Sequence, residues 1–177
     1  HFFDLPDSVP LRHYVSENKQ TNISFILDTI LNLLDFLREL HSNRIIYASI
    51  HPSNFFISTT HNLSIIDMAF TLSLDDIRFV PEGKIIGFFP YLAPEQMDKS
   101  EYQIDQRTDL FCAGLLLYSL INGSTPFENE ADTIGTLLEA TLKKEIISLK
   151  QIHGLLNAII IKSLKTAPDE RYQTADG

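Results

Sequence analysis

The sequence predicts a mainly α-helical domain with one small β-hairpin. Three observations carry this prediction: a long amphipathic segment in the first quarter of the chain, two brief apolar strands near residue 60, and an almost wholly apolar segment in the second half. Hydrophobic residues make up 44% and charged residues 21% of the 177 residues. This balance is that of an ordinary globular protein, and the length is enough for one domain with a sizeable core.

The long amphipathic segment begins after Asn22, whose side chain is suited to cap the first turn of a helix. Apolar residues then recur at helical spacing, which predicts one helix ending near His41. A short helix over residues 11–17 is expected before it, after a strand-like segment that ends at Pro10.

The two brief apolar strands cover residues 55–58 and 63–66 and flank four polar residues, the pattern of a hairpin. Residues 45–54 before them look short and irregular and contain Pro52. Residues 67–95 after them are of mixed polarity and carry several prolines and glycines. We expect a long loop there, and loops of that length are usually functional or disordered.

The second half is predicted to be helical. Residues 109–122 are apolar on nearly all sides, as expected of a buried central helix, and Gly123 is suited to end it. Two further helices are expected over residues 132–142 and 152–164, and another is expected to begin at Thr174.

Charge and cysteine content exclude several classes of function. The formal net charge is -9, which argues against nucleic acid and acidic membrane surfaces as partners because both require a basic footprint. The single cysteine, Cys112, cannot form an internal disulfide, so we expect a reducing, cytoplasmic location. The longest apolar run, residues 110–121, is too short to span a bilayer.

Several short strings follow one another in a fixed order. They are IIYASIHPSNFFI at residues 45–57, LSIIDMA at 63–69, GFFPYLAPEQ at 87–96, DQRTDLFCAG at 105–114 with TPF at 125–127, and DERY at 169–172. In this order they resemble the C-terminal lobe of the eukaryotic-type Ser/Thr protein kinase family, especially bacterial or multidomain signalling kinases. The resemblance implies one kinase-like C-lobe over residues 1–177. It also implies that the N-lobe is absent, because the chain contains neither a Gly-rich loop nor a strand lysine.

The resemblance also implies that the catalytic loop has lost its chemistry. Ser49 stands where the family has its catalytic Asp, His51 where a Lys contacts phosphate, and Ala48 where an Arg receives an activation-loop phosphate. A serine is not a base near neutral pH, and losing a general base typically costs about 10²–10⁴ in rate. A histidine is mostly neutral at pH 7.

The family's cofactor positions are only partly kept. Asn54 and Asp67 stand at its two metal-binding positions and supply the oxygen atoms that Mg²⁺ prefers. Met68 and Ala69 replace the Phe and Gly of the metal-binding segment. Phe56 stands where the family usually has a Leu that forms the floor of the adenine site. The resemblance therefore implies no cofactor for this chain, with ATP and magnesium bound only when an N-lobe is supplied.

The structural positions of the family are intact. Glu95 and Arg171 match a pair that the family buries as an ion pair, and Asp109 matches the Asp that holds the catalytic-loop backbone. Structural residues without catalytic ones predict a catalytically impaired scaffold or regulatory module. Its partners would be proteins or other domains of a parent signalling protein.

Two alternatives remain open at this point. One is an active Ser/Thr kinase domain once an N-lobe completes it, which would normally require Asp in place of Ser49. The other is a generic helical interaction domain, which would be favoured if Glu95 and Arg171 lay far apart. A Ser49–His51 nucleophile is a weaker reading, because the sequence places no orienting carboxylate beside them.

Overall fold

The structure is a computed structural model that describes residues 8–17, 22–58, 62–68, 71–75, 85, 87–97, 102–128, 131–143, 146, 149 and 152–177. The expected hairpin turn at residues 59–61, Ala69 and much of the expected long loop lie outside the described residues. The part that is described is mainly helical with small antiparallel sheets, as the sequence predicts.

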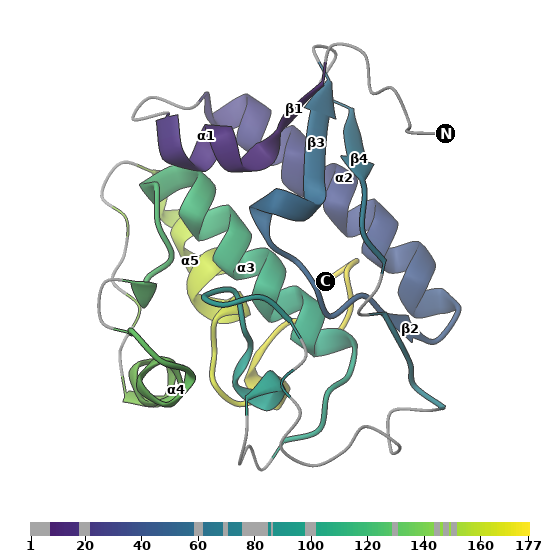
Figure 1. Ribbon diagram of the computed structural model, residues 1–177, viewed down its shortest axis with the longest axis vertical. Coiled ribbons are helices and arrows are strands. Elements are labelled where there is room, and N and C mark those ends of the chain that lie inside the picture. Colours follow the sequence, from purple (N-terminus) through teal and green to yellow (C-terminus); the bar gives the residue numbers. More distant parts are fainter. Residues whose placement is uncertain are drawn as a thin grey trace.

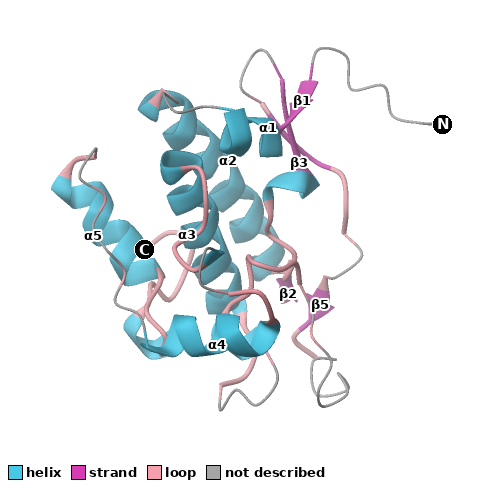
Figure 2. Cartoon of the chain, turned by 60° about the vertical axis from the view of Figure 1, so that its left-hand side comes forward, coloured by secondary structure: helices cyan, strands magenta, loops and turns pink. Residues whose placement is uncertain are grey.

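All of the described strands and the first two helices lie in the first half of the chain, and three further helices follow in its second half (Figures 1 and 2). The helices are α1 (Leu11–Glu17), α2 (Ile23–Ser42), α3 (Gln106–Asn122), α4 (Ile134–Lys143) and α5 (Gly154–Ser163). The strands are β1 (Ser8–Pro10), β2 (Ile45–Ile46), β3 (Phe55–Ser58), β4 (Leu63–Ile65) and β5 (Leu72–Ser73). Short 3₁₀ turns cover Pro52–Asn54, Pro94–Gln96 and Pro168–Glu170.

The predicted hairpin is confirmed and forms the centre of a three-stranded sheet. Strand β3 lies between β1 and β4 and is antiparallel to both. Phe55 and Ile57 are fully buried, whereas Phe56 between them is only half-buried. This alternation follows from the period of two along a strand, and it turns Phe56 to the face opposite the core.

A second pair of strands corrects two expectations. Strand β2 pairs antiparallel with β5, with Ile46 opposite Leu72. The sequence predicts an irregular segment over residues 45–54 and a long loop over residues 67–95. Two-residue strands are too short to show alternation, and their pairing depends on contacts that are distant in sequence.

Helix α2 begins and buries its face as predicted. The side chain of Asn22 accepts a hydrogen bond from the Ser24 backbone N–H at 2.9 Å, which caps the first turn. The residues that α2 buries recur at helical spacing and are Phe25, Ile26, Thr29, Ile30, Leu33 and Leu37. This face packs against α3, which lies between α2 and α5 in both views (Figures 1 and 2).

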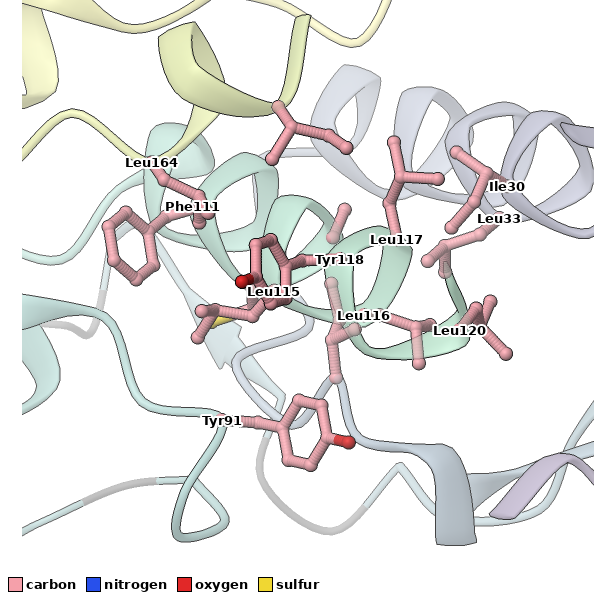
Figure 3. Packing of buried hydrophobic residues seen from close by; sticks show 14 of the residues in the cluster. Ile30, Leu33, Tyr91, Phe111, Leu115, Leu116, Leu117, Tyr118, Leu120 and Leu164 are labelled. Carbon is pink, nitrogen blue, oxygen red and sulfur yellow. The ribbon is translucent and has the colours of Figure 1, made fainter. Parts of the chain in front are cut away.

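Helix α3 is the central helix of the core. It begins three residues earlier than predicted, at Gln106, because Asp105 caps it by accepting a hydrogen bond from the Arg107 N–H at 2.8 Å. It ends as predicted at Gly123, which has the left-handed φ of 83°. Its residues 108–120 are all buried. Figure 3 shows Leu117 facing Ile30 and Leu33 of α2, and Phe111 beside Leu164.

The remaining helices differ from the predictions only at their ends, except for the last. Helices α4 and α5 occupy the two predicted regions. The helix expected to begin at Thr174 is wrong for the described residues. There, the Gly177 N–H donates to the Thr174 carbonyl at 3.2 Å and closes a single turn. Among the described residues, no helix has both the length and the apolar character needed to cross a membrane.

The close approach of α3 and α5 generates a prediction about Gly114. A Cβ atom added there would lie 2.8 Å from the Ser163 Cβ and 3.2 Å from Leu164 Cδ2. We expect Gly114→Ala to lower the free energy of unfolding by about 1–3 kcal/mol, because overpacking forces the two helices apart. Urea unfolding measures this change.

The matched control is Gly135→Ala in α4, where the nearest atom to an added Cβ is Thr133 Oγ1 at 3.8 Å. We expect this variant to gain about 0.5–1 kcal/mol, since alanine loses less backbone entropy in a helix than glycine does. Equal effects at the two positions would contradict the proposed close contact between α3 and α5.

Candidate functional site

The start of the loop over residues 47–54 is held in place by a buried carboxylate. Asp109, on α3, is fully buried. Its Oδ2 accepts hydrogen bonds from the Tyr47 backbone N–H at 2.9 Å and from His41 Nε2 at 2.8 Å. Its Oδ1 accepts from the Ala48 backbone N–H at 2.8 Å. These donors compensate the loss of water around the carboxylate and fix the start of the loop to α3.

Ala48 is held at both of its backbone groups. Its N–H is bound by Asp109, and its carbonyl accepts from Gln96 Nε2 at 2.8 Å. The residue has a left-handed φ of 57°, which costs a non-glycine residue of order 1–3 kcal/mol. The two hydrogen bonds therefore hold a strained backbone and tie the loop to the Pro94–Gln96 turn.

Ser49 lies at the position that the resemblance assigns to the catalytic base. It is 2% exposed, and Asn54, 5% exposed, lies beside it. Asn54 Nδ2 donates to both the Ser49 carbonyl and the Ser49 Oγ, each at 3.0 Å. The asparagine amide thus closes the loop on itself, and the serine hydroxyl that it contacts has no basicity at neutral pH.

His51 lies at the phosphate-contacting position and carries no charge at neutral pH. Its side chain is buried and stacks on Phe88, with 3.9 Å between the ring centroids and 13° between the ring planes. Burial lowers the pKa of His51 to about 4, against the opposing effect of Asp67. Residues 47–54 contain no Lys or Arg, so this loop offers a phosphate group no cation.

Asp67 and Phe56 lie at the neighbouring hairpin. The Tyr47 hydroxyl donates to the Asp67 carbonyl at 2.7 Å, and the Ile66 N–H donates to the Asn54 carbonyl at 3.1 Å. Asn54 directly precedes β3 and Asp67 follows β4, so both residues lie at the open end of the hairpin. Phe56 projects from the sheet face turned away from the core.

Asn54 and Asp67 supply two of the oxygen donors of a magnesium site, whereas the loop over residues 47–54 supplies no charged group for a phosphate. The Asn54 amide oxygen and the Asp67 carboxylate are the oxygen types that Mg²⁺ takes. Asn54 Nδ2 donates to Ser49, so the amide oxygen, the atom that a metal ion would take, is not used in these hydrogen bonds, and His51 is neutral. Within the described ranges, no three His, Cys, Asp or Glu side chains gather closely enough to hold a metal ion.

Glu95 and Arg171 meet although they are 76 residues apart. Arg171 Nη1 lies 2.6 Å from Glu95 Oε1, and Nη2 lies 2.9 Å from Oε2, so the two side chains form a bidentate pair. Both side chains are fully buried. Further hydrogen bonds satisfy the pair: Glu95 accepts from Thr108 Oγ1, and Arg171 donates to the carbonyls of Lys165, Thr166 and Arg107.

Three residues of the site are not predicted by the sequence pattern. His41, which the sequence marks only as the end of the long helix, contacts Asp109. Gln96 links Ala48 to Ala93, because its Oε1 also accepts the Ala93 N–H at 2.9 Å. Tyr47 reaches Asp67. Two of them could have been found from their positions in the sequence: His41 lies in the last helical turn before the loop, and Gln96 directly follows Pro94 and Glu95.

Cys112 is buried beside this network, as the sequence predicts. Its Sγ lies 3.2 Å from Gln96 Oε1, and burial raises the pKa of the thiol well above its usual value. A buried thiol of this kind is a small packing group and not a nucleophile.

Comparison with known proteins agrees with the resemblance. Residues 2–176 match a family described as "Protein kinase domain". The chain is 30% identical over 173 residues to the probable serine/threonine-protein kinase CE0033 of Corynebacterium efficiens, covering 93% of the chain and 26% of the relative. It is 27% identical over 174 residues to the serine/threonine-protein kinase PknB of Mycobacterium leprae, covering 96% and 27%.

A third relative is the probable serine/threonine-protein kinase CA_C1728 of Clostridium acetobutylicum, 25% identical over 171 residues, which cover 94% of the chain and 25% of the relative. The chain therefore spans about a quarter of the length of the relatives it matches.

The Glu95–Arg171 pair generates a prediction about stability. Arg171→Ala leaves a buried carboxylate without its partner, so we expect a loss of about 3–5 kcal/mol in the free energy of unfolding. Glu95→Gln should cost less, because it keeps the shape and part of the hydrogen bonding. The double variant should lose clearly less than the sum of the two, since the residues are coupled.

Urea unfolding of the two single variants and the double variant measures this coupling. If Arg171→Ala does not fold, Arg171→Lys replaces it in the same cycle, because lysine keeps the charge but loses the bidentate geometry. Additive losses below 1 kcal/mol would contradict a buried, coupled pair.

The buried His51 generates a prediction about pH. Its pKa is about 4 in the folded state, below the ordinary 6.5, so the unfolded chain binds more protons between these values. The free energy of unfolding should therefore fall as the pH drops from 6.5 towards 4, by at most about 1.4 kcal/mol per pH unit for one proton. In His51→Gln, this part of the pH dependence should disappear.

Urea unfolding at pH 7.0, 5.5 and 4.5 compares the two proteins, and His153→Gln, at an exposed cap of α5, is the matched control. An equal pH dependence in wild type and His51→Gln would show that His51 is not held neutral by burial.

Proposed function

The chain belongs to the protein kinase domain family, and we propose that it is a catalytically impaired member that acts as a scaffold or regulatory module. One observation carries the proposal. At the place of the catalytic base stands Ser49, which is 2% exposed and bound through both its carbonyl and its hydroxyl oxygen by Asn54.

The chemistry of phosphoryl transfer makes this observation decisive. Transfer depends on positioning, on a group that accepts the proton of the attacking hydroxyl, and on cations that neutralise the phosphate. Ser49 cannot accept that proton, and loss of a general base alone costs about 10²–10⁴ in rate. His51 is neutral at pH 7 and stacked on Phe88, so it cannot replace a cation.

The retained framework supports the regulatory part of the proposal. Asp109 and the Glu95–Arg171 pair keep the loop, the Pro94–Gln96 turn and the C-terminal segment in a fixed arrangement. A rigid surface is useful for binding even where no reaction occurs. We propose that residues 1–177 are the C-terminal lobe of a kinase-like domain, located in the cytoplasm, that contacts proteins or other domains of a signalling protein.

An active Ser/Thr kinase is the second candidate. The three relatives are named as serine/threonine-protein kinases, and the family match favours this reading as well. In that case, an N-lobe would supply the phosphate cradle, and another group would have to replace the missing base. Position 49 discriminates the two candidates.

We expect no phosphotransferase activity. The 177-residue chain, and the longest natural chain that contains it, are incubated with labelled ATP, magnesium and a generic protein substrate. Label transfer should not exceed the blank, because Ser49 and His51 supply neither base nor cation. The matched control is Asp67→Ala, which removes one of the two oxygen donors. Transfer by the wild type that Asp67→Ala abolishes would overturn the proposal.

A further inference from the structure

We propose that the outward face of α2 is a docking surface for a basic amphipathic helix of a partner protein. The inference deepens the proposed regulatory function and rests on it, because it names the class of partner that the module would bind. The surface is the α2 ridge, formed by Ile23, Leu27 and Leu31, whose exposed fractions are 39%, 38% and 59%.

The three side chains form one continuous ridge. They are four residues apart, so they lie one above another on the same face of the helix. The opposite face of α2 is buried against α3, and both α3 and α5 lie on that buried side (Figures 1 and 2). Single exposed apolar residues are normal on protein surfaces, but an aligned row of large ones marks an interaction site.

Charge beside the ridge indicates which partner fits it. Asp28, Asp35 and Glu39 are exposed on the flank of the α2 ridge. Helix α2 carries these three acids and one base, Arg38, so its net charge is -3 + 1 = -2. Arg38 forms ion pairs with Asp35 and Asp176, so Asp28 and Glu39 give the flank its acidic character.

This charge disfavours two other occupants. A second copy of the chain would bring a like-charged flank against the first, and the whole chain has a net charge of -9. An anionic membrane surface would be repelled for the same reason. A partner with Lys or Arg beside its own apolar row would instead complement the flank.

Ridge geometry favours a helix as the partner element. The α2 ridge is of the i±4 type, and an i±4 row packs against an i±3 row of a second helix at a crossing angle of about +20°, which lets the partner run alongside α2. From Ile23 to Glu39, the helix rises by about 24 Å at 1.5 Å per residue. A partner helix of about 12–16 residues would cover the ridge and its acidic flank.

The test measures binding of a designed peptide to the intact chain. The probe is a fluorescent, amidated helical peptide of about 16 residues with a leucine row and lysines on one flank. The matched peptide has glutamates in place of the lysines. Fluorescence anisotropy compares wild type with Leu31→Ser, with Glu39→Lys, and with Leu155→Ser as control. Leu155, at 67% exposure on α5, is equally apolar but lies outside the ridge.

We expect the basic peptide to bind wild type and Leu155→Ser alike, with at least about tenfold weaker binding to Leu31→Ser and Glu39→Lys. Unchanged thermal melts would show that all variants are folded. The proposal is overturned if the acidic peptide binds as tightly, if Leu155→Ser loses as much, or if the basic peptide does not bind. A dimer of the chain that Leu31→Ser dissociates would also overturn it, because a second copy would then cover the ridge.

The assay contains no nucleotide, so its outcome is independent of phosphotransfer. Activity in the labelled-ATP experiment would remove the impaired-kinase proposal without changing peptide binding. Failure of the peptide to bind would remove the docking surface and leave the catalytic argument unchanged.

Discussion

The carboxylate of Asp109 is the constraint on which the rest of the site depends. It is fully buried on the central helix α3, so its oxygens must be satisfied by the protein. They are satisfied by the last turn of α2, through His41, and by the backbone N–H groups of Tyr47 and Ala48. A single side chain thereby fixes the long helix, the central helix and the start of the loop relative to one another.

The contacts that hold the backbone around Asp109 differ from the side chains that stand at the family's catalytic positions. The strained Ala48 is held in place by Asp109 and Gln96. The Glu95–Arg171 pair joins the Pro94–Gln96 turn to the C-terminal segment. These contacts fix the backbone in place, and the residues that make them do not stand at the family's catalytic positions. The loop's side chains at those positions are Ser49 and His51. At neutral pH, Ser49 is not a base and His51 carries no charge. The proposed scaffold or regulatory function rests on this separation of the framework from the catalytic positions.

Much of this architecture could be predicted from the sequence, because the helices and the hairpin follow from local sequence patterns. Helical spacing and the cap at Asn22 predicted α2, and two short apolar stretches flanking polar residues predicted the hairpin of β3 and β4. The resemblance brought Glu95 and Arg171 to attention, and the structure places them together. Pairing of β2 with β5 and the bond between His41 and Asp109 could not be predicted. Both join segments distant in sequence through one or two residues, which leaves no periodic signal.

Native-state hydrogen exchange of the Tyr47 and Ala48 amides, with and without millimolar Mg-ATP, tests the central claim most directly. Both amides donate to the buried Asp109, so they should exchange only through global unfolding, as the α3 amides do. Mg-ATP should leave their protection unchanged, because a ligand that does not bind the folded state cannot stabilise it. Fast local exchange while α3 stays protected, or a saturable gain in protection with Mg-ATP, would contradict a loop that is structurally anchored and chemically inert.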